Sequence, residues 1–349
     1  MAKITPIRFE EGKLILLDQR LLPNTTEYIY IDKVKNVHDA IKNMVVRGAP
    51  AIGVTAAYGM VISANECQSD CCEDILKKMK IDGDLLKQAR PTAVNLEWAV
   101  DLMNIKAAAI KKKDPILFKW DLLAEATKIH QRDVIANRAI GEYALSILKD
   151  KTNILTHCNA GILATTEYGT ATSVFYIGKE KGIDFHVFAD ETRPRLQGSR
   201  LTAYELMENG VDVTVISDSA AAYLMSKGEI DAVITGADRI AANGDTANKI
   251  GTLSVSVNAK YFDIPMYIAA PLSTIDLTLM SGNLIPIEER GAEEVVNRFG
   301  IQTAPVGVKV RNPAFDITPA SNISAIITEK GIVYPPYREG IMKLFRNQP

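Results

Sequence analysis

The sequence is poor in cysteine, with four in 349 residues, and three of these, Cys67, Cys71 and Cys72, lie close together. Four cysteines do not make a disulfide framework, so we expect reduced thiols. No histidine accompanies the three clustered cysteines and no second cysteine pair follows them, so a closed tetrahedral zinc site would lack its fourth ligand. We predict no metal there and assign these three residues no function.

Long apolar runs are also missing. The segment 52–64 is interrupted by Gly, Thr, Tyr and Ser and falls short of the roughly 18 to 20 residues that a membrane span requires. Residues 1–6 lack the charged start and apolar stretch of a secretory signal. We therefore expect a cytoplasmic protein with no membrane partner.

Charge of one sign is not in excess. Lys and Arg total 40, Asp and Glu total 42, and the formal net charge is −2. This balance gives no general attraction for nucleic acid or anionic lipid, so no nucleic-acid partner is expected. The 47% hydrophobic and 23% charged residues are typical of a globular protein with ample core. Any anion must therefore be bound by local groups.

The first part of the chain predicts a small antiparallel sheet followed by helices. Residues 7–17 alternate apolar and polar around Glu11 and Gly12, as in a hairpin, and 28–31 predict a third strand. From about 37 to 130 the apolar residues recur every three or four positions, the spacing of one helix face. Breaks between helices are expected at 48–50, 82–84, 90–91 and 114–115.

After about residue 150, compact apolar runs predict strands that alternate with crossover helices. A helix over 199–209 should end at Gly210. The alternation indicates an α/β protein with a mainly parallel sheet covered on both faces. We expect two domains, 1–125 with short antiparallel strands plus helices and 126–349 with the parallel sheet. The predicted strands are 153–156, 185–188, 211–216, 232–234 and 265–270.

Two residues beyond the ends of predicted strands are candidates for chemistry. Ligands of open parallel sheets bind beyond the carboxyl ends of the strands. Cys158 follows the strand at 153–156 and Asp238 follows the strand at 232–234, so both are predicted to face a common ligand. Partial burial of Asp238 would raise its pKa toward the range useful for proton transfer.

Plainer interpretations of these residues stay open. A lone cysteine such as Cys158 is most often a small buried hydrophobe. Asp238 could pair with the adjacent Arg239 or cap a helix. His157 lies beside Cys158, but neighbouring residues on a strand point to opposite faces, so a thiolate–imidazole pair is not predicted.

Three places resemble phosphate sites. Arg47-Gly48-Ala49-Pro50 leads into a helical run, where close backbone approach and free N–H groups favour an anion. Arg90-Pro91-Thr92 likewise opens a predicted helix. Further hydrogen-bond donors precede helical segments of the sheet domain at 197–200 and at Asn248-Lys249. No G-x-G-x-x-G follows a strand and G-x-x-x-x-G-K-[ST] is absent, so no nucleotide is indicated. The pattern favours a small phosphorylated substrate.

Taken together, these motifs resemble the methylthioribose-1-phosphate isomerase family of methionine salvage. The resemblance covers most of the chain. It rests on the segments 47–53, 90–96, 158–161, 191–194, 196–202, 236–239, 244–252 and 312–319.

The resemblance implies an aldose–ketose isomerase that converts 5-methylthioribose 1-phosphate to 5-methylthioribulose 1-phosphate without a metal or organic cofactor. It also implies a homodimer with a Rossmann-like C-terminal domain and a smaller N-terminal domain. By the same likeness Asp238 matches the proton donor and Cys158 the second catalytic residue. The positions matching substrate contacts are Arg47, Gly48, Ala49, Arg90, Gln197, Asn248 and Lys249.

The resemblance leaves the substrate and one chemical step open. Relatives with the same catalytic pair act on 5-deoxyribose 1-phosphate, and a missing thioether at C5 gives only modest discrimination. Hydrogen could move between C2 and C1 as a proton, with Cys158 as base, or as a hydride. The family is also related to regulatory subunits of the eukaryotic initiation exchange factor, which do not catalyse; retention of Cys158 and Asp238 argues against that alternative.

Overall fold

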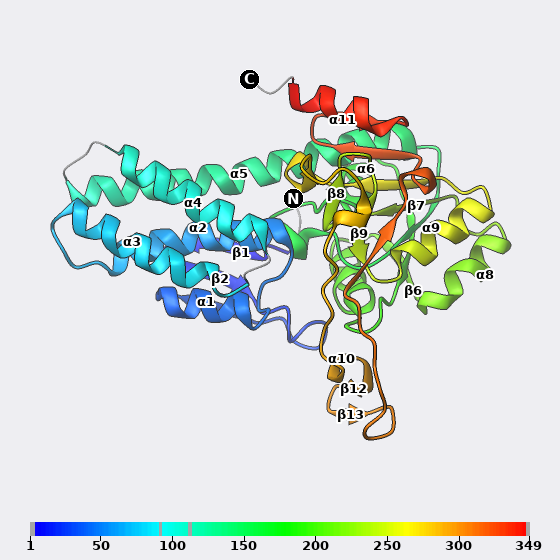
Figure 1. Ribbon diagram of the computed structural model, residues 1–349, viewed down its shortest axis with the longest axis horizontal. Coiled ribbons are helices and arrows are strands. Elements are labelled where there is room, and N and C mark those ends of the chain that lie inside the picture. The colour runs from blue at the N-terminus through cyan, green and yellow to red at the C-terminus, as the bar shows by residue number, and fades with distance from the viewer. Residues whose placement is uncertain (1–3, 91–92, 111–113, 347–349) are drawn as a thin grey trace. The chain divides into compact units, whose positions relative to one another are not determined.

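The structure is a computed structural model that describes residues 4–90, 93–110 and 114–346. The chain falls into two compact units, which are described separately: unit 1 is Met1–Ile135 with Gly161–Gly169, and unit 2 is Ala136–Ala160 with Thr170–Pro349. The boundary expected after residue 125 lies inside helix α5 (Pro115–Leu148) (Figure 1). Among the residues described, no helix is both long and apolar enough to cross a membrane.

Unit 1 begins with the predicted antiparallel sheet, in the order β1-β2-β3. Its hairpin turns at Glu11 and Gly12, which both have positive φ. Four further helices precede α5 in this unit. The elements are β1 (Ile7–Glu10), β2 (Lys13–Leu17), β3 (Tyr28–Ile31), α1 (Val34–Lys42), α2 (Ala49–Glu66), α3 (Cys72–Lys87) and α4 (Val94–Ala109).

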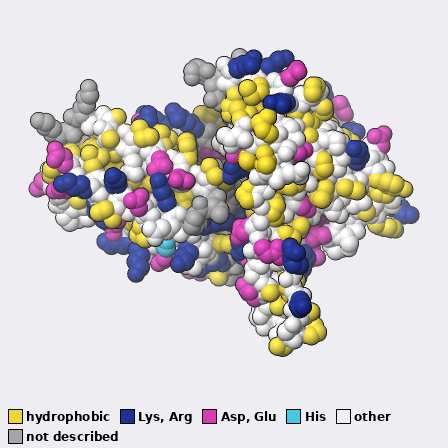
Figure 2. Space-filling view, in the orientation of Figure 1, with side chains coloured by type: hydrophobic (Ala, Val, Ile, Leu, Met, Phe, Trp, Pro, Cys, Tyr) yellow, Lys and Arg dark blue, Asp and Glu magenta, His cyan; other side chains and the backbone are white. Residues whose placement is uncertain are grey.

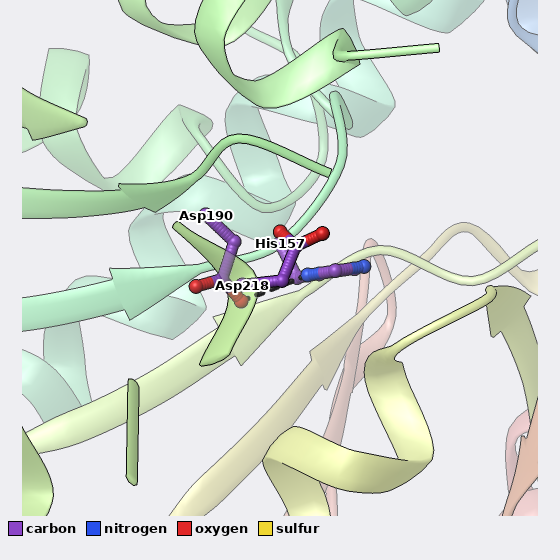
Figure 3. Close-up of side chains that lie close together, drawn as sticks. All are labelled: His157, Asp190 and Asp218. Carbon is purple, nitrogen blue, oxygen red and sulfur yellow. Dashed lines mark hydrogen bonds and ion pairs between the residues drawn. The ribbon is translucent and has the colours of Figure 1, made fainter. Parts of the chain in front are cut away.

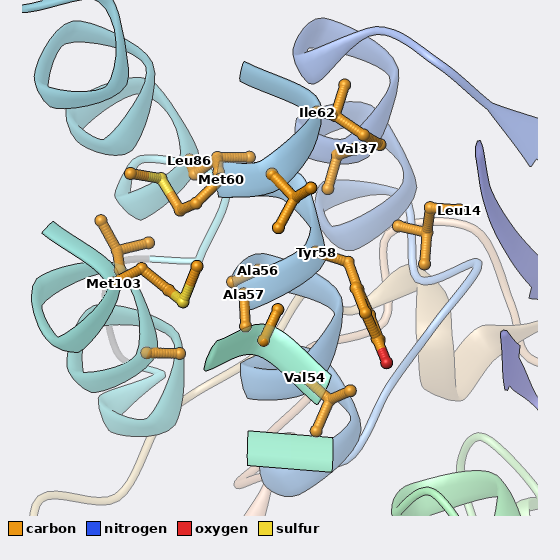
Figure 4. Packing of buried hydrophobic residues seen from close by; sticks show 14 of the residues in the cluster. Leu14, Val37, Val54, Ala56, Ala57, Tyr58, Met60, Ile62, Leu86 and Met103 are labelled. Atoms are coloured by element: carbon orange, nitrogen blue, oxygen red, sulfur yellow. The ribbon is translucent and has the colours of Figure 1, made fainter. Parts of the chain in front are cut away.

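Helix α2 is the centre of the unit 1 core (Figure 4). Every residue from Ala51 to Ala64 is buried, which a helix tolerates only when neighbours surround it. The break predicted at 82–84 is wrong, because α3 continues through Gly83. A Cβ on Gly83 would lie 2.8 Å from Val100 Cγ1, so this glycine lets α3 pack closely against α4 rather than ending the helix.

Unit 2 contains the predicted parallel sheet, with strand order β16-β15-β10-β7-β4-β5-β6. Only β16 runs antiparallel to its neighbour. From β4 the chain adds β5 and β6 on one side and then β7, β10 and β15 on the other, so the order reverses between β4 and β7. Their bounds are β4 (Asn153–Thr156), β5 (His186–Asp190), β6 (Asp212–Ile216), β7 (Ala232–Thr235), β10 (Met266–Ala269), β15 (Ala325–Thr328) and β16 (Gly331–Val333).

The crossover helices of unit 2 include the one expected over 199–209. It starts as a π-helical turn, η2 (Gly198–Thr202), continues as α7 (Ala203–Glu208) and stops before Gly210, whose φ is +71°. A Cβ on Gly198 would overlap the carbonyl of Asp190, so the turn packs against the end of β5. Other helices of the unit include α6 (Ser173–Glu180), α8 (Ala221–Ser226), α9 (Thr252–Tyr261) and α11 (Tyr337–Arg346).

A second sheet in unit 2, with order β11-β8-β9-β14, was not predicted. Its strands are only two to four residues long, which leaves little periodic pattern to detect. It carries the chain directly after β7 and therefore places Asp238 and Lys249. Its strands are β8 (Arg239–Ala241), β9 (Thr246–Lys249), β11 (Ile275–Asp276) and β14 (Phe315–Thr318).

An arm that holds α10 (Glu293–Val296), β12 (Asn297–Arg298) and β13 (Ile301–Gln302) projects from unit 2 (Figure 1). Apolar side chains are visible at the end of the arm (Figure 2). Phe299, between β12 and β13, and Val306, after β13, are exposed.

Candidate active site

Cys158 and Asp238 follow adjacent strands at the point where the strand order reverses. Strands β4 and β7 are paired in parallel, and each is followed at its carboxyl end by one of these residues. A Cβ added to Gly236, just past β7, would lie 2.5 Å from the Cβ of Ala160, so the two segments touch. Ligands of open α/β sheets bind at such a switch point.

The backbone of Cys158 is held on both sides. Its N–H donates to Thr192 Oγ1 (2.8 Å), and its carbonyl accepts from Thr202 Oγ1 (2.6 Å). Its thiol forms no disulfide bond and its side chain is buried. The φ of Cys158 is +67°, a left-handed conformation that a non-glycine residue adopts at a cost and that is common at functional sites. The turn after β5 and the π-helical turn thus fix the backbone of Cys158.

Asp238 lies in the bend between β7 and β8, and its N–H donates to the carbonyl of Ala247 (2.9 Å). Its side chain is exposed, so the expected partial burial is wrong. The reason is that burial along this segment ends at Gly236, two residues earlier. The neighbouring Arg239 forms an ion pair with Asp276 (2.8 Å).

Asn248 and Lys249 end β9. The amide of Asn248, which is buried, donates to Thr252 Oγ1 (3.0 Å). Lys249 Nζ donates to the carbonyl of Ala314 (2.9 Å) and lies 4.4 Å from the ring centre of Phe315. Both side chains are therefore held by unit 2 itself.

Gln197 directly precedes the π-helical turn η2 and is its N-cap residue. Its side chain is buried, with 8% of its surface exposed, and Oε1 has no hydrogen-bond partner within the described part of the chain. A buried acceptor of this kind is costly unless a donor reaches it. A ligand hydroxyl is one such donor, which fits the substrate contact implied by the resemblance.

The predicted residues Arg47, Gly48 and Ala49 lie in unit 1 at the start of α2. Gly48 precedes the helix with φ +92°, and a Cβ there would overlap the carbonyl of Ala164. Only glycine fits this position. Because the start of a helix favours an anion, phosphate binding here stays a prediction.

Arg90 also lies in unit 1, half-buried, and its carbonyl accepts the N–H of Ala93 (2.9 Å). The expected Pro91-Thr92 continuation lies outside the described residues. Helix α4 begins at Val94.

The sequence did not identify a cluster formed by His157, Asp190 and Asp218 (Figure 3). The register that pairs Thr156 with Ala189 places His157 beside Asp190, and Nδ1 lies 2.8 Å from Asp190 Oδ2. His157 Nε2 lies 2.9 Å from the carbonyl of Ile250; because a carbonyl only accepts, this nitrogen carries a hydrogen. Burial alone would lower the pKa of His157, but hydrogen bonds to Asp190 and to Ile250 raise it.

Asp218 completes this group, and its ligand atoms lie within 4.8 Å of those of His157 and Asp190. Such a set could suggest a metal site. However, both ring nitrogens of His157 are used, by Asp190 and by a backbone carbonyl. The carboxylate of Asp218 accepts the N–H groups of Thr192 and Arg193, both at 2.7 Å. The donor set is therefore committed within the protein and does not fit a metal.

Comparisons with known proteins identify a matching family and similar sequences and structures. Residues 45–335 match the Initiation factor 2 subunit family. The chain is 58% identical, over 99% of each chain, to a 5-deoxyribose 1-phosphate isomerase of Clostridium botulinum (strain Kyoto / Type A2).

Two solved structures are similar over nearly the whole chain. A 5-methylthioribose 1-phosphate isomerase from Pyrococcus horikoshii OT3 superposes with a TM-score of 0.96 at 43% identity, covering 99% of this chain and 97% of that one. A translation initiation factor eIF-2B, subunit delta, from A. fulgidus gives a TM-score of 0.92 at 43% identity, covering 99% and 100%.

Proposed function

The chain belongs to the Initiation factor 2 subunit family, and on that premise we propose that it is a sugar-phosphate isomerase acting on 5-deoxyribose 1-phosphate. The observation that carries the proposal is the placement of Cys158 and Asp238 at the ends of the paired strands β4 and β7. A single ligand at the switch point would reach both side chains. The 58% identity to a 5-deoxyribose 1-phosphate isomerase supports the substrate.

The reaction needs help at the ring oxygen, because phosphate on the anomeric oxygen prevents simple opening to a free aldehyde. Asp238, protonated, donates to the ring oxygen as the bond from that oxygen to C1 breaks. Hydrogen then moves from C2 to C1 while the C2 hydroxyl loses its proton and becomes the ketone. A bound sugar would cover the exposed carboxyl of Asp238 and raise its pKa, which favours the protonated acid.

Two routes serve the hydrogen transfer. In one, Cys158 removes the proton from C2 and an enediol intermediate is protonated at C1. In the other, hydrogen migrates as a hydride to the electron-poor C1 in a dry pocket. Cys158 is buried and held by its backbone, a setting compatible with either role.

Binding is assigned to the residues that the resemblance indicates. The buried Oε1 of Gln197 would accept a hydrogen bond from a sugar hydroxyl. Asn248 and Lys249 would contribute polar contacts from the end of β9. Arg47, Gly48, Ala49 and Arg90 stay predicted phosphate ligands. A homodimer is part of the proposal and is checked by light scattering of the purified protein.

A second substrate, 5-methylthioribose 1-phosphate, is favoured by the structural similarity to an isomerase of that name. The two sugars differ only at C5, where an apolar pocket discriminates by about 10- to 200-fold per group at most. Comparison of kcat/KM for both sugars, with ketose formation followed by NMR, tests the proposal. We expect the higher value for 5-deoxyribose 1-phosphate; the reverse order would assign the chain to methionine salvage.

Formation of no ketose from either sugar would contradict the isomerase proposal. That result would favour the non-catalytic alternative, to which the similarity with an eIF-2B subunit points. The placement of Cys158 and Asp238 just beyond the paired strands β4 and β7 favours the isomerase over a protein that only binds partners.

A further inference from the structure

His157 connects the segment of Cys158 to the segment of Lys249. One ring nitrogen faces Asp190 at the end of β5, and the other donates to the carbonyl of Ile250 (2.9 Å). Ile250 directly follows Lys249, and His157 directly precedes Cys158. A single buried ring therefore joins two parts of the candidate site that are about ninety residues apart in sequence.

The turn at Ile250 and Gly251 is shaped to accept this ring. Gly251 has φ +106°, and a Cβ there would lie 2.7 Å from His157 Cε1, so the backbone lies directly against the imidazole. Asp316 on β14 accepts the N–H groups of Gly251 (2.7 Å) and Leu253 (3.0 Å). His157 and Asp316 therefore both hold the turn.

We propose that His157 is a positioning residue that keeps Asn248 and Lys249 in register with Cys158. Asp190 fixes the orientation of the ring, as a carboxylate does for a histidine that must present its other nitrogen. The ring nitrogens are both used, so His157 does not act as a base for Cys158. The expected effect of His157 on catalysis rests on the proposed function. The anchoring of the turn at Ile250 and Gly251 does not depend on that function.

The activity test uses His157→Gln, which keeps a polar side chain but loses the imidazole ring that contacts both Asp190 and the carbonyl of Ile250. Because displacement of binding groups by about 1 Å costs up to ~100-fold in rate, we expect kcat/KM to fall by ~10- to 100-fold, mainly through KM. The matched control is His186→Gln, since His186 also pairs with an aspartate (Asp212, 2.7 Å) but at the opposite end of β5. The control should stay within about twofold of wild type.

If His157 had only a structural role, its substitution would lower only the amount of folded protein. A double variant distinguishes a positioning role from a structural one. In a Lys249→Ala background, His157→Gln should lower kcat/KM by a smaller factor than in the wild-type background, because one of the two positioned groups is already gone. Full additivity of the two substitutions would contradict the proposal.

An activity-free measurement keeps the proposal testable if the chain turns over neither sugar. Amide hydrogen exchange over residues 246–253, read by mass spectrometry, should accelerate in His157→Gln and not in His186→Gln. Unchanged exchange there would overturn the proposal whatever the activity. If His157→Gln does not fold, Asp190→Asn replaces it, and exchange over residues 246–253 should again accelerate, by a smaller amount. Unchanged exchange in Asp190→Asn would also contradict the proposal.

Discussion

Gly236 and Ala160 lie so close that a Cβ on Gly236 would come within 2.5 Å of the Cβ of Ala160. One residue follows the buried strand β7 and the other follows the turn after β4. Their contact sets the spacing between the segments that carry Asp238 and Cys158. Real Cβ atoms do not approach so closely, so any side chain at Gly236 must push these segments apart.

Gly236→Ala should therefore lower activity and stability together. Overpacking of a tight contact costs about 1–3 kcal/mol, which thermal unfolding will register, and kcat/KM should fall with it. Ala160→Gly in the same chain removes the opposing methyl group and should restore most of both losses. If the double variant is no better than Gly236→Ala, the contact does not set the geometry of the site.

Asp238→Asn should abolish turnover and leave substrate binding largely intact. The amide has nearly the shape of the carboxyl but does not transfer a proton, and general acid catalysis contributes about 10²- to 10⁴-fold. Single-turnover rates and calorimetric binding measure the two effects. Asp231→Asn is the matched control, since Asp231 lies at the other end of β7 and accepts the N–H groups of Thr152 and Asn153. Near-normal turnover in Asp238→Asn would remove this residue from the mechanism.

Cys158→Ser separates the two hydrogen-transfer routes when combined with heavy water. If Cys158 carries a proton, wild-type product formed in deuterium oxide gains deuterium at C1, and the variant loses most of its activity because a serine hydroxyl is a far weaker base. Direct hydride migration brings in no deuterium. Cys71→Ser, which changes an exposed thiol, should behave as wild type; a loss of activity there would indicate a role for the cysteine cluster that our account lacks.

Much of unit 2 was predictable because its signals are local. The apolar runs identified β4 and β7, and the sheet rule then placed Cys158 and Asp238 at one edge. The pair of His157 with Asp190 was not predictable, because it depends on the register between β4 and β5. Exposure of Asp238 was missed for a similar reason: burial beyond a strand is decided by the short second sheet, which has too few residues to give a pattern.

Helix α10 of the arm should show a pH dependence of stability that arises from Glu294. Burial alone would raise the pKa of Glu294, but hydrogen bonds from Arg290 and Arg195 outweigh it and lower the pKa to about 2. A carboxyl with a depressed folded-state pKa stabilises the fold above its ordinary pKa, near 4.5, and this contribution is lost as the pH falls toward 2.

Glu294→Gln should therefore be less stable than wild type at pH 7, and the difference should narrow below about pH 4.5. Urea unfolding at a series of pH values measures it. The neighbouring Glu293 is exposed, so Glu293→Gln is the control and should show little difference at any pH. A stability gap for Glu294→Gln that stays constant down to pH 3 would exclude the ion pairs as its cause.

A crystal structure with the ketose 1-phosphate product bound tests the central claim most directly. We expect the Asp238 carboxyl within hydrogen-bond distance of the product's C4 hydroxyl, which was the ring oxygen, and Cys158 Sγ against C1 and C2 of the same molecule. A product bound away from the ends of β4 and β7, or in contact with only one of the two side chains, would contradict the account.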